Sequence, residues 1–341
     1  MSSYIAIDAM GGDEGLSVML AGVALARQRF DSLRFLLVGD EAAIAPALKS
    51  YPALAQCTEI VHAPDLITAS EKPSQALRRA KTTSMGMAID MVKQGRAGVA
   101  VSAGNTGALM AIAKIALRTL PGIDRPALAA LMPTLGKNDV VMLDLGANTE
   151  CDARNLVQFA VMGAAYARTT LDLAAPRVAL LNIGTEALKG TDSIRDAAAM
   201  LKAATHLPMV FSGFVEGNQL SHGNVDVIVC DGFTGNIALK TAEGTAKFVG
   251  DLLKRAFRSS IRSKFGFLIS RPATKLLRDH LDPNNHNGGV FLGLNGLVVK
   301  SHGGANAIGV AHAIEVAAKM LRDDLTRRIS DDLSNFEAQA A

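Results

Sequence analysis

Six short segments of the chain combine glycine with asparagine, threonine, aspartate or lysine, each between an apolar run and a helical pattern. Glycine lets backbone N–H groups approach a ligand closely, and the helix that follows adds unpaired N–H donors and the positive end of its dipole. We expect these turns to meet on one rim of a sheet, where they would form a donor-rich pocket suited to phosphate and to a developing oxyanion. The segments span residues 8–15, 102–109, 144–152, 182–192, 231–240 and 300–309.

The usual nucleotide fingerprints are missing from these segments. None fits GxxxxGK[ST], and none gives a clean GxGxxG followed by an acidic partner for a ribose. A single glycine turn would be weak evidence of a site, because tight turns between strands and helices need glycine for packing anyway. Six such junctions without a nucleotide signature indicate another phosphate-bearing ligand.

The elements that would position these turns are strands alternating with helices. This alternation predicts βαβ units and an α/β fold with a mainly parallel sheet flanked by helices. The expected strands are Tyr4–Ile7, Leu33–Val38, Val99–Ser102, Val140–Asp144, Val178–Asn182, Met209–Phe211, Val225–Cys230 and Gly296–Val299. The expected helices are Glu14–Arg29, Thr106–Arg118, Ala153–Thr169, Ser193–Ala203, Ala246–Arg258 and Ala305–Leu325.

No Pro/Gly/Ser linker divides the chain into two compositions, so we expect a single α/β catalytic body over residues 1–330. Within it, residues 246–281 are expected to form a basic helical protrusion. Residues 331–341 are expected to form a tail.

Charge and cysteine content limit the possible partners and location. The net charge of +3 is too small to indicate a nucleic-acid binder. The stretch from Ala246 to His280 nevertheless holds nine Lys or Arg and two Asp, a net of +7, and is a candidate contact for an acidic partner. Three cysteines without CxxC or metal-ligand spacing, and no signal-like or membrane-spanning segment, predict a cytoplasmic protein without a metal.

Seven segments, in order between residue 4 and residue 325, resemble the bacterial phosphate acyltransferase family PlsX. They are IAIDAMGGD, VSAGNTGALMA, DLGANTECDARNLVQFAVMG, LLNIGTEALKGTD, GFVEGN, DVIVCDGFTGNIALKTAEG and GLNGLVVKSHGGANA. Each is short, but the ordered set is specific.

The resemblance implies a homodimer with a Rossmann-like fold, related to phosphotransacetylases and isopropylmalate dehydrogenases, that uses no cofactor. It also implies the reaction of long-chain acyl-[acyl carrier protein] with inorganic phosphate, which gives acyl phosphate and free carrier protein. The product would feed a membrane glycerol-3-phosphate acyltransferase on the way to phosphatidic acid in phospholipid synthesis.

That reaction depends on the positioning of phosphate and the thioester more than on a strong acid or base. Phosphate is already an anionic nucleophile at neutral pH, and a leaving thiol with a pKa of about 8.5 can depart largely as thiolate. The site must hold phosphate, polarise the thioester carbonyl and exclude water. Lysines and asparagines on glycine-rich loops can do this, so no Ser-His-Asp set is required.

Three residues are candidates for catalysis. Lys189, between Gly184 and Gly190, could bind phosphate or neutralise the tetrahedral intermediate, or it could be a solvated surface lysine. Asn236, in the first turn of a helix, could donate to the carbonyl oxygen. His302 could protonate the leaving sulfur, or it could be a structural histidine held by hydrogen bonds.

Residues on the same junctions are candidates for binding phosphate and the thioester. Asn105 and Thr106 could donate to phosphate or could simply cap a helix. Asp8 would order its loop or hold a lysine, and Lys240 could instead be an exposed helix residue. Cys230 is expected in the core, because a direct displacement needs no acyl-enzyme. The full set is Asp8, Gly11, Gly12, Ser102, Gly104, Asn105, Thr106, Asn182, Gly184, Asp231, Gly235 and Lys240.

The basic segment contains a short apolar tip between positive charges, which would suit an anionic membrane surface or the acidic carrier protein. The alternative is that the tip packs in a dimer interface with the charges around it. The residues concerned are Arg262, Lys264, Phe265, Phe267, Leu268, Ile269 and Arg271.

Other functions remain open at this point. A phosphotransacetylase-like enzyme acting on acyl-coenzyme A would use the same phosphate chemistry. A non-catalytic scaffold that brings carrier protein to the membrane would not need a phosphate pocket. An oxidoreductase is disfavoured, because no nucleotide fingerprint and no metal-binding carboxylate cluster on one helix is apparent.

Overall fold

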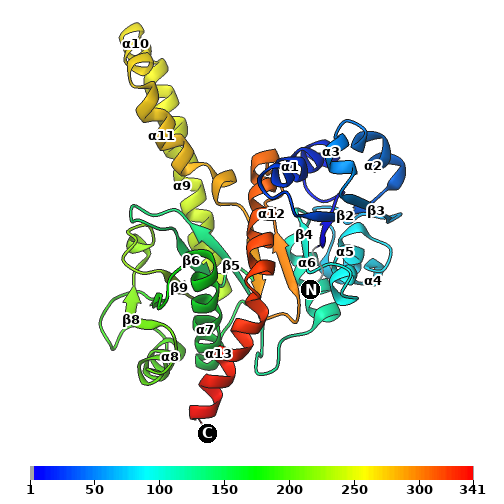
Figure 1. Ribbon diagram of the computed structural model, residues 1–341. Coiled ribbons are helices and arrows are strands. Elements are labelled where there is room, and N and C mark those ends of the chain that lie inside the picture. The colour runs from blue at the N-terminus through cyan, green and yellow to red at the C-terminus, as the bar shows by residue number, and fades with distance from the viewer. Residues whose placement is uncertain (1–3, 341) are drawn as a thin grey trace.

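The computed structural model describes residues 4–340 of the 341-residue chain. Within this range, eleven strands form one sheet in the order β3-β2-β1-β4-β11-β10-β5-β6-β9-β7-β8 (Figure 1). The strands are β1 Tyr4–Asp8, β2 Arg34–Gly39, β3 Thr58–His62, β4 Val99–Ser102, β5 Ala127–Met132, β6 Val140–Leu143, β7 Arg177–Leu181, β8 Val210–Val215, β9 Val227–Val229, β10 Gly289–Leu292 and β11 Leu297–Lys300.

Two strands in the middle of the sheet reverse its direction. β10 is antiparallel to both of its neighbours, β11 and β5, and β5 is antiparallel to β6. The other neighbouring strands pair in parallel. As a result, the carboxyl ends of β1, β2, β3, β4 and β11 lie at one edge of the sheet, and those of β6, β7, β8 and β9 lie at the opposite edge.

Helices cover both faces of the sheet. The α-helices are α1 Gly15–Arg29, α2 Glu41–Leu48, α3 Pro52–Ala55, α4 Pro73–Arg79, α5 Ser84–Lys93, α6 Thr106–Leu117, α7 Ala153–Thr170, α8 Asp192–Ala203, α9 Gly232–Arg258, α10 Ile261–Ile269, α11 Arg271–Leu281, α12 Ala307–Arg322 and α13 Leu325–Ala340. Two short 3₁₀ helices, η1 Gly217–Gln219 and η2 Pro283–His286, lie in the connections.

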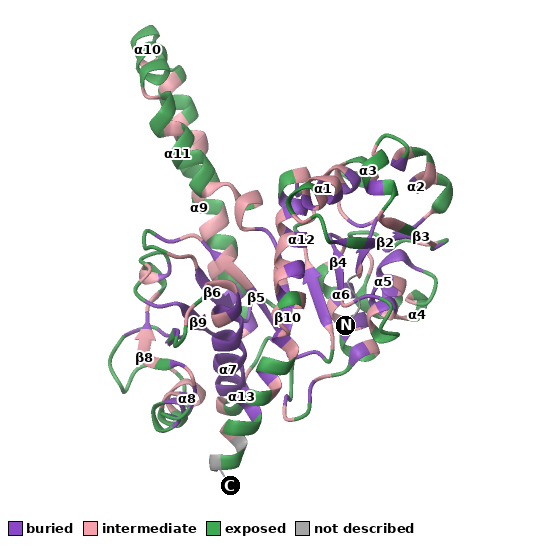
Figure 2. Cartoon of the chain, viewed as in Figure 1, coloured by how far each residue is buried: buried purple, intermediate pink, exposed green. Residues whose placement is uncertain are grey.

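The two faces of the sheet carry separate apolar cores. Ile5 and Ile7 of β1 belong to the core under α1, α7, α12 and α13, whereas Ala6 belongs to the core under α4, α5, α6 and the start of α9. Figure 2 shows α7 buried along its length, in contrast to α10 and α11. Strands buried on both faces read as continuous apolar runs, which is why VAVS at Val99–Ser102 could be identified from the sequence.

The expected α/β fold with a mainly parallel sheet is confirmed, but three strands were missed. β5 has the sequence ALAALM, whose residues favour helices in isolation, so that its tertiary neighbours decide its conformation. β10 has only four residues and begins with glycine. β3 is a half-exposed edge strand. Because β5 and β10 were not predicted, the reversal of strand direction in the middle of the sheet was not predicted either.

The basic segment forms a helical hairpin that projects from the body (Figure 1). The helix expected at Ala246–Arg258 is the second half of the longer α9; α10 packs against α9, and α11 leads back from the tip to the body. The rings of Phe257 and Phe267 pack with their centroids 5.2 Å apart. Despite its length, neither α9 nor any other helix within residues 4–340 has the apolar stretch needed to cross a membrane.

The tail expected at residues 331–341 is wrong for most of that range. α13 continues to Ala340, Leu333 is buried in the core, and Asp332 forms an ion pair with Arg168 of α7. Amphipathic packing against α7 therefore holds this helix, a contact that local sequence does not reveal. Ala341 lies outside the described residues.

Candidate functional site

A cavity of about 410 Å³ opens at the edge of the sheet where β1, β4 and β11 end. Its lining comes from three of the predicted junctions, residues 8–15, 102–109 and 300–309, which we call the cavity junctions. The fourth wall is a segment before α4, Leu66–Ala69. Because β1, β4 and β11 are parallel neighbours, their carboxyl ends place these junctions side by side.

Close backbone contacts hold the cavity junctions together. Asp13 N donates a 2.8 Å hydrogen bond to Gly303 O. Gly12 has a positive φ of 99°, and a Cβ there would stand 3.1 Å from Ala103 Cβ and 3.3 Å from Gly303 O. Glycine is thus required at position 12 both for its backbone conformation and for space.

Asp8 and Ser102 lie beneath the cavity and order its loops. Ser102 Oγ donates a 2.6 Å hydrogen bond to Asp8 Oδ2 and accepts one from Gly104 N at 3.1 Å. Asp8 Oδ1 is buried without a hydrogen-bond partner among the described residues, and burial raises the pKa of this carboxyl. Asp8 therefore takes the loop-ordering role considered for it rather than a place in the cavity wall.

Asn105 caps α6 and fixes the fourth wall. Its Oδ1 accepts a hydrogen bond from Ala108 N at 3.0 Å, and its Nδ2 donates to Ala69 O at 2.8 Å and to Glu71 O at 3.1 Å. Because these bonds occupy the amide group of Asn105, its side chain fits the helix-capping alternative better than donation to phosphate. What the start of α6 offers a ligand is the N–H groups of Thr106 and Gly107, which have no carbonyl partner inside the helix.

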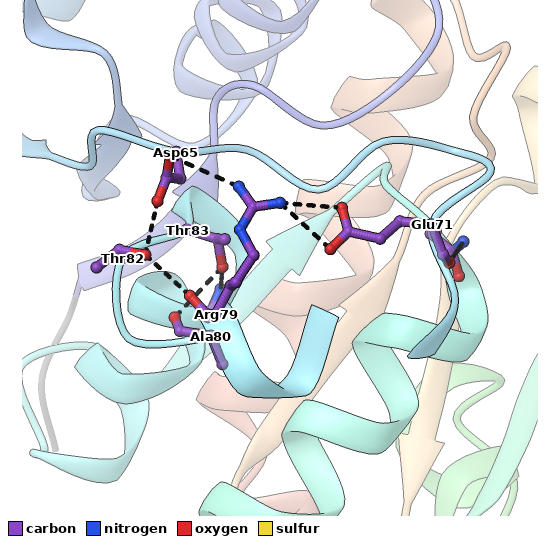
Figure 3. A network of polar contacts seen from close by, with 8 residues as sticks. Asp65, Glu71, Arg79, Ala80, Thr82 and Thr83 are labelled. Atoms are coloured by element: carbon purple, nitrogen blue, oxygen red, sulfur yellow. Dashed lines mark hydrogen bonds and ion pairs between the residues drawn. The ribbon is translucent and has the colours of Figure 1, made fainter. Parts of the chain in front are cut away.

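Arg79 braces the same wall at both of its ends (Figure 3). Its guanidinium lies 3.5 Å from Asp65 Oδ1 and 3.4 Å from Glu71 Oε1, and Thr82 Oγ1 donates to Asp65 Oδ2 at 2.7 Å. Asp65 precedes and Glu71 follows the cavity-lining Leu66–Ala69, so that one side chain closes the loop.

Lys300, at the end of β11, is a cavity residue that the sequence analysis missed. Its Nζ donates to Ala103 O at 3.3 Å and to Ser301 O. Burial lowers the pKa of Lys300 to about 8, although the negative charges of Asp13 and Asp8 act to raise it. The sequence placed Lys300 in a candidate junction, but only the tertiary structure shows that its side chain is half-buried in the cavity wall.

His302 takes part in the turn rather than in the cavity wall. Its backbone N donates to Asn287 Oδ1 at 2.9 Å, and its Nδ1 accepts a hydrogen bond from Gly304 N at 3.1 Å. The ring is exposed and does not line the cavity. This arrangement fits the structural alternative; its catalytic role stays a prediction.

The other three junctions, residues 144–152, 182–192 and 231–240, lie at the opposite edge of the sheet. We call them the opposite junctions. The expectation that all six meet on one rim is therefore wrong within a single chain, because β10 and β5 reverse the direction of β6, β7 and β9. Asn182, Gly184, Lys189, Asp231, Gly235 and Asn236 all belong to this second group.

The opposite junctions are organised around a buried carboxylate. Asp144 Oδ1 accepts hydrogen bonds from Leu128 N and Ala147 N, and its Oδ2 accepts from both N and Nδ2 of Asn148, at 2.7 to 3.0 Å. A Cβ at Gly235 would stand only 1.9 Å from Asp144 O, so glycine lets α9 start against this loop. These contacts show that Asp144 orders the loop of residues 144–152 and fixes the start of α9 against it.

Asp231 is the N-cap of α9. Its Oδ1 accepts from Thr234 N at 2.8 Å, and its Oδ2 accepts from Thr234 Oγ1 at 2.7 Å. Asn236 lies in the first turns of this helix, near where the sequence placed it, and is exposed beside Gly146.

Lys189 lies in an exposed loop that is folded around Asn182. The Nδ2 of Asn182 donates to Lys189 O at 3.1 Å, and its Oδ1 accepts from Ile183 N at 2.9 Å. The side chain of Lys189 is exposed and does not line the described cavity, which fits the surface alternative for a single subunit.

Helix α9 connects the two edges of the sheet. Lys240 lies eight residues after Gly232, about 12 Å along the helix axis at 1.5 Å per residue, which is close to the length of a four-residue strand. The positive charge of Lys240 contributes to lowering the pKa of Lys300, so α9 carries Lys240 towards the cavity. Lys240 also forms an ion pair with Glu243 at 2.7 Å.

Replacing Arg79 with Met should loosen the cavity wall without unfolding the protein. Half-exposed ion pairs of this kind are worth up to about 1 kcal/mol, which corresponds to roughly fivefold faster amide hydrogen exchange over residues 66–71. The matched control is Arg78→Met, one residue earlier on the same helix and exposed. Equal exchange in the two variants would show that Arg79 does not hold the wall.

Comparison with known proteins identifies the family. The family model described as "Fatty acid synthesis protein" matches residues 3–328. Proteins described as phosphate acyltransferase are 66% identical over 97% of this chain and 94% of the protein from Erythrobacter litoralis (strain HTCC2594), and 54% identical over 98% of this chain and 94% of the protein from Rhodospirillum centenum (strain ATCC 51521 / SW).

Among solved structures, the EutD phosphotransacetylase from Staphylococcus aureus matches with a TM-score of 0.62 at 18% identity, over 94% of each chain. At that identity the match shows the fold alone, which agrees with the expected relation to phosphotransacetylases. The sequence relatives and the family model, each covering nearly the whole chain, carry the assignment. The chain belongs to the bacterial phosphate acyltransferase family, PlsX.

Proposed function

We propose that this phosphate acyltransferase binds inorganic phosphate and the thioester of a long-chain acyl-[acyl carrier protein] in the cavity at the ends of β1, β4 and β11. The observation that carries the proposal is the meeting of a half-buried ammonium with the first N–H groups of α6. Lys300, Thr106 and Gly107 line one cavity, and each presents a donor suited to an anion.

The two ends of the thioester would face chemically different walls. The glycine loops and Lys300 offer N–H donors, whereas Leu66 and Ile67 give the fourth wall an apolar surface for the acyl chain. A phosphate held on the first wall would be placed for attack on a thioester carbonyl lying between them. The donors would then stabilise the negative charge that develops on the carbonyl oxygen.

The cysteines near the opposite junctions support direct displacement. Burial and the charges of Asp144 and Asp231 raise the pKa of Cys151 to about 12 and raise that of Cys230 well above its ordinary value. Neither thiol therefore supplies a thiolate nucleophile at neutral pH. The phosphate oxygen forms the new C–O bond itself, and the electron pair of the broken C–S bond goes to sulfur.

The exposed basic hairpin supports an acidic partner for this reaction. Nine Lys or Arg lie between Ala246 and His280, and the tip exposes 65% of Phe265, 63% of Leu268 and 83% of Ile269. We propose that the hairpin attracts the acidic carrier protein and an anionic membrane surface, which would bring the product to a membrane glycerol-3-phosphate acyltransferase. The enzyme would then be a cytoplasmic, peripherally membrane-associated homodimer.

An assay of product formation tests the reaction. Acyl-[acyl carrier protein] and acyl-coenzyme A are each incubated with the protein, with and without phosphate, and acyl phosphate and free thiol are measured. We expect phosphate-dependent acyl phosphate from the carrier-protein substrate. Activity with coenzyme A alone would favour the phosphotransacetylase-like alternative, and no phosphate-dependent release from either donor would favour a scaffold.

A catalytic role for Lys189 would require a second subunit, because its own chain places it at the edge opposite the cavity. If the partner's loop completes the site, Lys189→Ala should lower turnover at least about tenfold, as expected for one lost contact to phosphate or the oxyanion. Mixed dimers with Lys300→Ala should then recover part of the activity. Near-normal turnover of Lys189→Ala would assign this lysine to the solvated surface.

Membrane contact is tested by vesicle sedimentation. The double variant Leu268→Asp, Ile269→Asp should bind vesicles rich in phosphatidylglycerol at least about tenfold more weakly, since two exposed apolar side chains are lost from the tip. Phe267 is left unchanged because it packs on Phe257. Ile115→Asp, at a residue 61% exposed on the body, is the matched control. Equal binding of both variants would contradict contact through the tip.

A further inference from the structure

The half-buried ammonium of Lys300 has one donor left for a ligand. An ammonium carries three N–H bonds, and the carbonyls of Ala103 and Ser301 accept two of them. Both carbonyls belong to the cavity junctions, so they fix the Nζ in the wall that the side chain lines. The remaining N–H is the one that can point into the cavity.

The surroundings of Lys300 make its two protonation states comparable in free energy. Burial favours the neutral amine, and the positive charge of Lys240 on α9 acts in the same direction. The carboxylates of Asp13 and Asp8 favour the ammonium. These effects leave the pKa of Lys300 at about 8, near neutral pH. A group of that pKa can both give and take a proton.

The proposed reaction has one proton to move. Monohydrogen phosphate carries a proton that the acyl phosphate product no longer holds, and the leaving thiolate needs one to become the thiol. When the phosphate oxygen forms the C–O bond, the C–S bond breaks and its electron pair stays on sulfur. A single group that contacts both reactants can therefore complete the exchange without any further reagent.

We propose that Lys300 relays this proton, giving one from Nζ to the leaving sulfur and taking one from the attacking phosphate. The proposal rests on the phosphate acyl transfer proposed above and adds a catalytic residue to it. After one turnover Lys300 is again an ammonium, so protons and charge balance.

Other titratable groups near the cavity are less suited to this role. His302 is exposed, its Nδ1 accepts from Gly304 N, and its ring does not line the cavity. Lys240 forms an ion pair with Glu243 and does not line the cavity either. Asp13 lines it, but an ionised carboxylate only accepts hydrogen bonds and has no proton to give to the leaving sulfur.

The test uses Lys300→Arg, because a guanidinium keeps the positive charge but does not release its proton in proteins. Two thioesters of the same fatty acid are compared as acyl donors: the N-acetylcysteamine thioester, whose alkyl thiolate needs protonation, and the S-phenyl thioester, whose less basic thiolate departs unaided. Lys114→Arg, at an exposed position on α6, is the matched control.

For Lys300→Arg we expect kcat to fall about 100-fold on the alkyl thioester, in line with the usual contribution of proton transfer, and less than about threefold on the phenyl thioester. The wild-type kcat on the alkyl thioester should fall as the pH rises above about 8, since the ammonium must donate. A bound phosphate dianion favours the ammonium, so it can only move this fall in kcat to higher pH. The kcat of Lys300→Arg should not show this fall at high pH.

Two outcomes would overturn the relay: an unchanged kcat of Lys300→Arg on the alkyl thioester, or equal losses on both thioesters. If thermal unfolding shows that this variant does not fold, the solvent deuterium isotope effect on the wild-type kcat decides instead. It should be normal with the alkyl thioester and absent with the phenyl thioester, and equal effects would refute the relay. A wild-type protein that makes no acyl phosphate would overturn the proposed function itself.

Discussion

Three successive antiparallel pairings, β11 with β10, β10 with β5 and β5 with β6, determine what can meet at a site in this protein. Strands β10 and β5 stand in the middle of an otherwise parallel sheet, and the strands on their two sides run in opposite directions. Because ligands bind beyond the carboxyl ends of parallel strands, each half carries its glycine-rich junctions at its own edge. One chain therefore has two sets of loops, and the described cavity lies between those of β1, β4 and β11.

Each set of loops is ordered by a buried carboxylate. Asp8 accepts a hydrogen bond from Ser102 beneath the cavity, and Asp144 accepts four N–H bonds at the opposite edge. Buried charge is costly unless it is hydrogen-bonded, and these donors compensate Asp144 only in part, because burial still raises the pKa of its carboxyl. Asp8 has one oxygen without a partner among residues 4–340, close to the ammonium of Lys300. The shape of each set of loops thus depends on a carboxyl group beneath it.

Helix α9 extends from the opposite edge of the sheet into the exposed hairpin. It starts against Asp144, passes Lys240 towards the cavity and continues into the exposed basic hairpin. The exposed basic hairpin and the cavity are therefore connected by one helix of 27 residues. This arrangement places the basic surface outside the body, whereas the cavity is lined by glycine loops and by the wall that Arg79 braces.

The sequence alone determined the fold class, the family, most strand positions, about half of the helices and the six junctions, because each depends on local patterns: apolar runs, helical periodicity and glycine-rich turns. It did not determine which junctions share a cavity, since β5 reads as a helix former and β10 is too short to notice. It also did not single out Lys300, whose chemistry arises from burial beside Asp8 and Asp13. Strand direction and local dielectric come from contacts between distant segments, so only the tertiary structure could decide them.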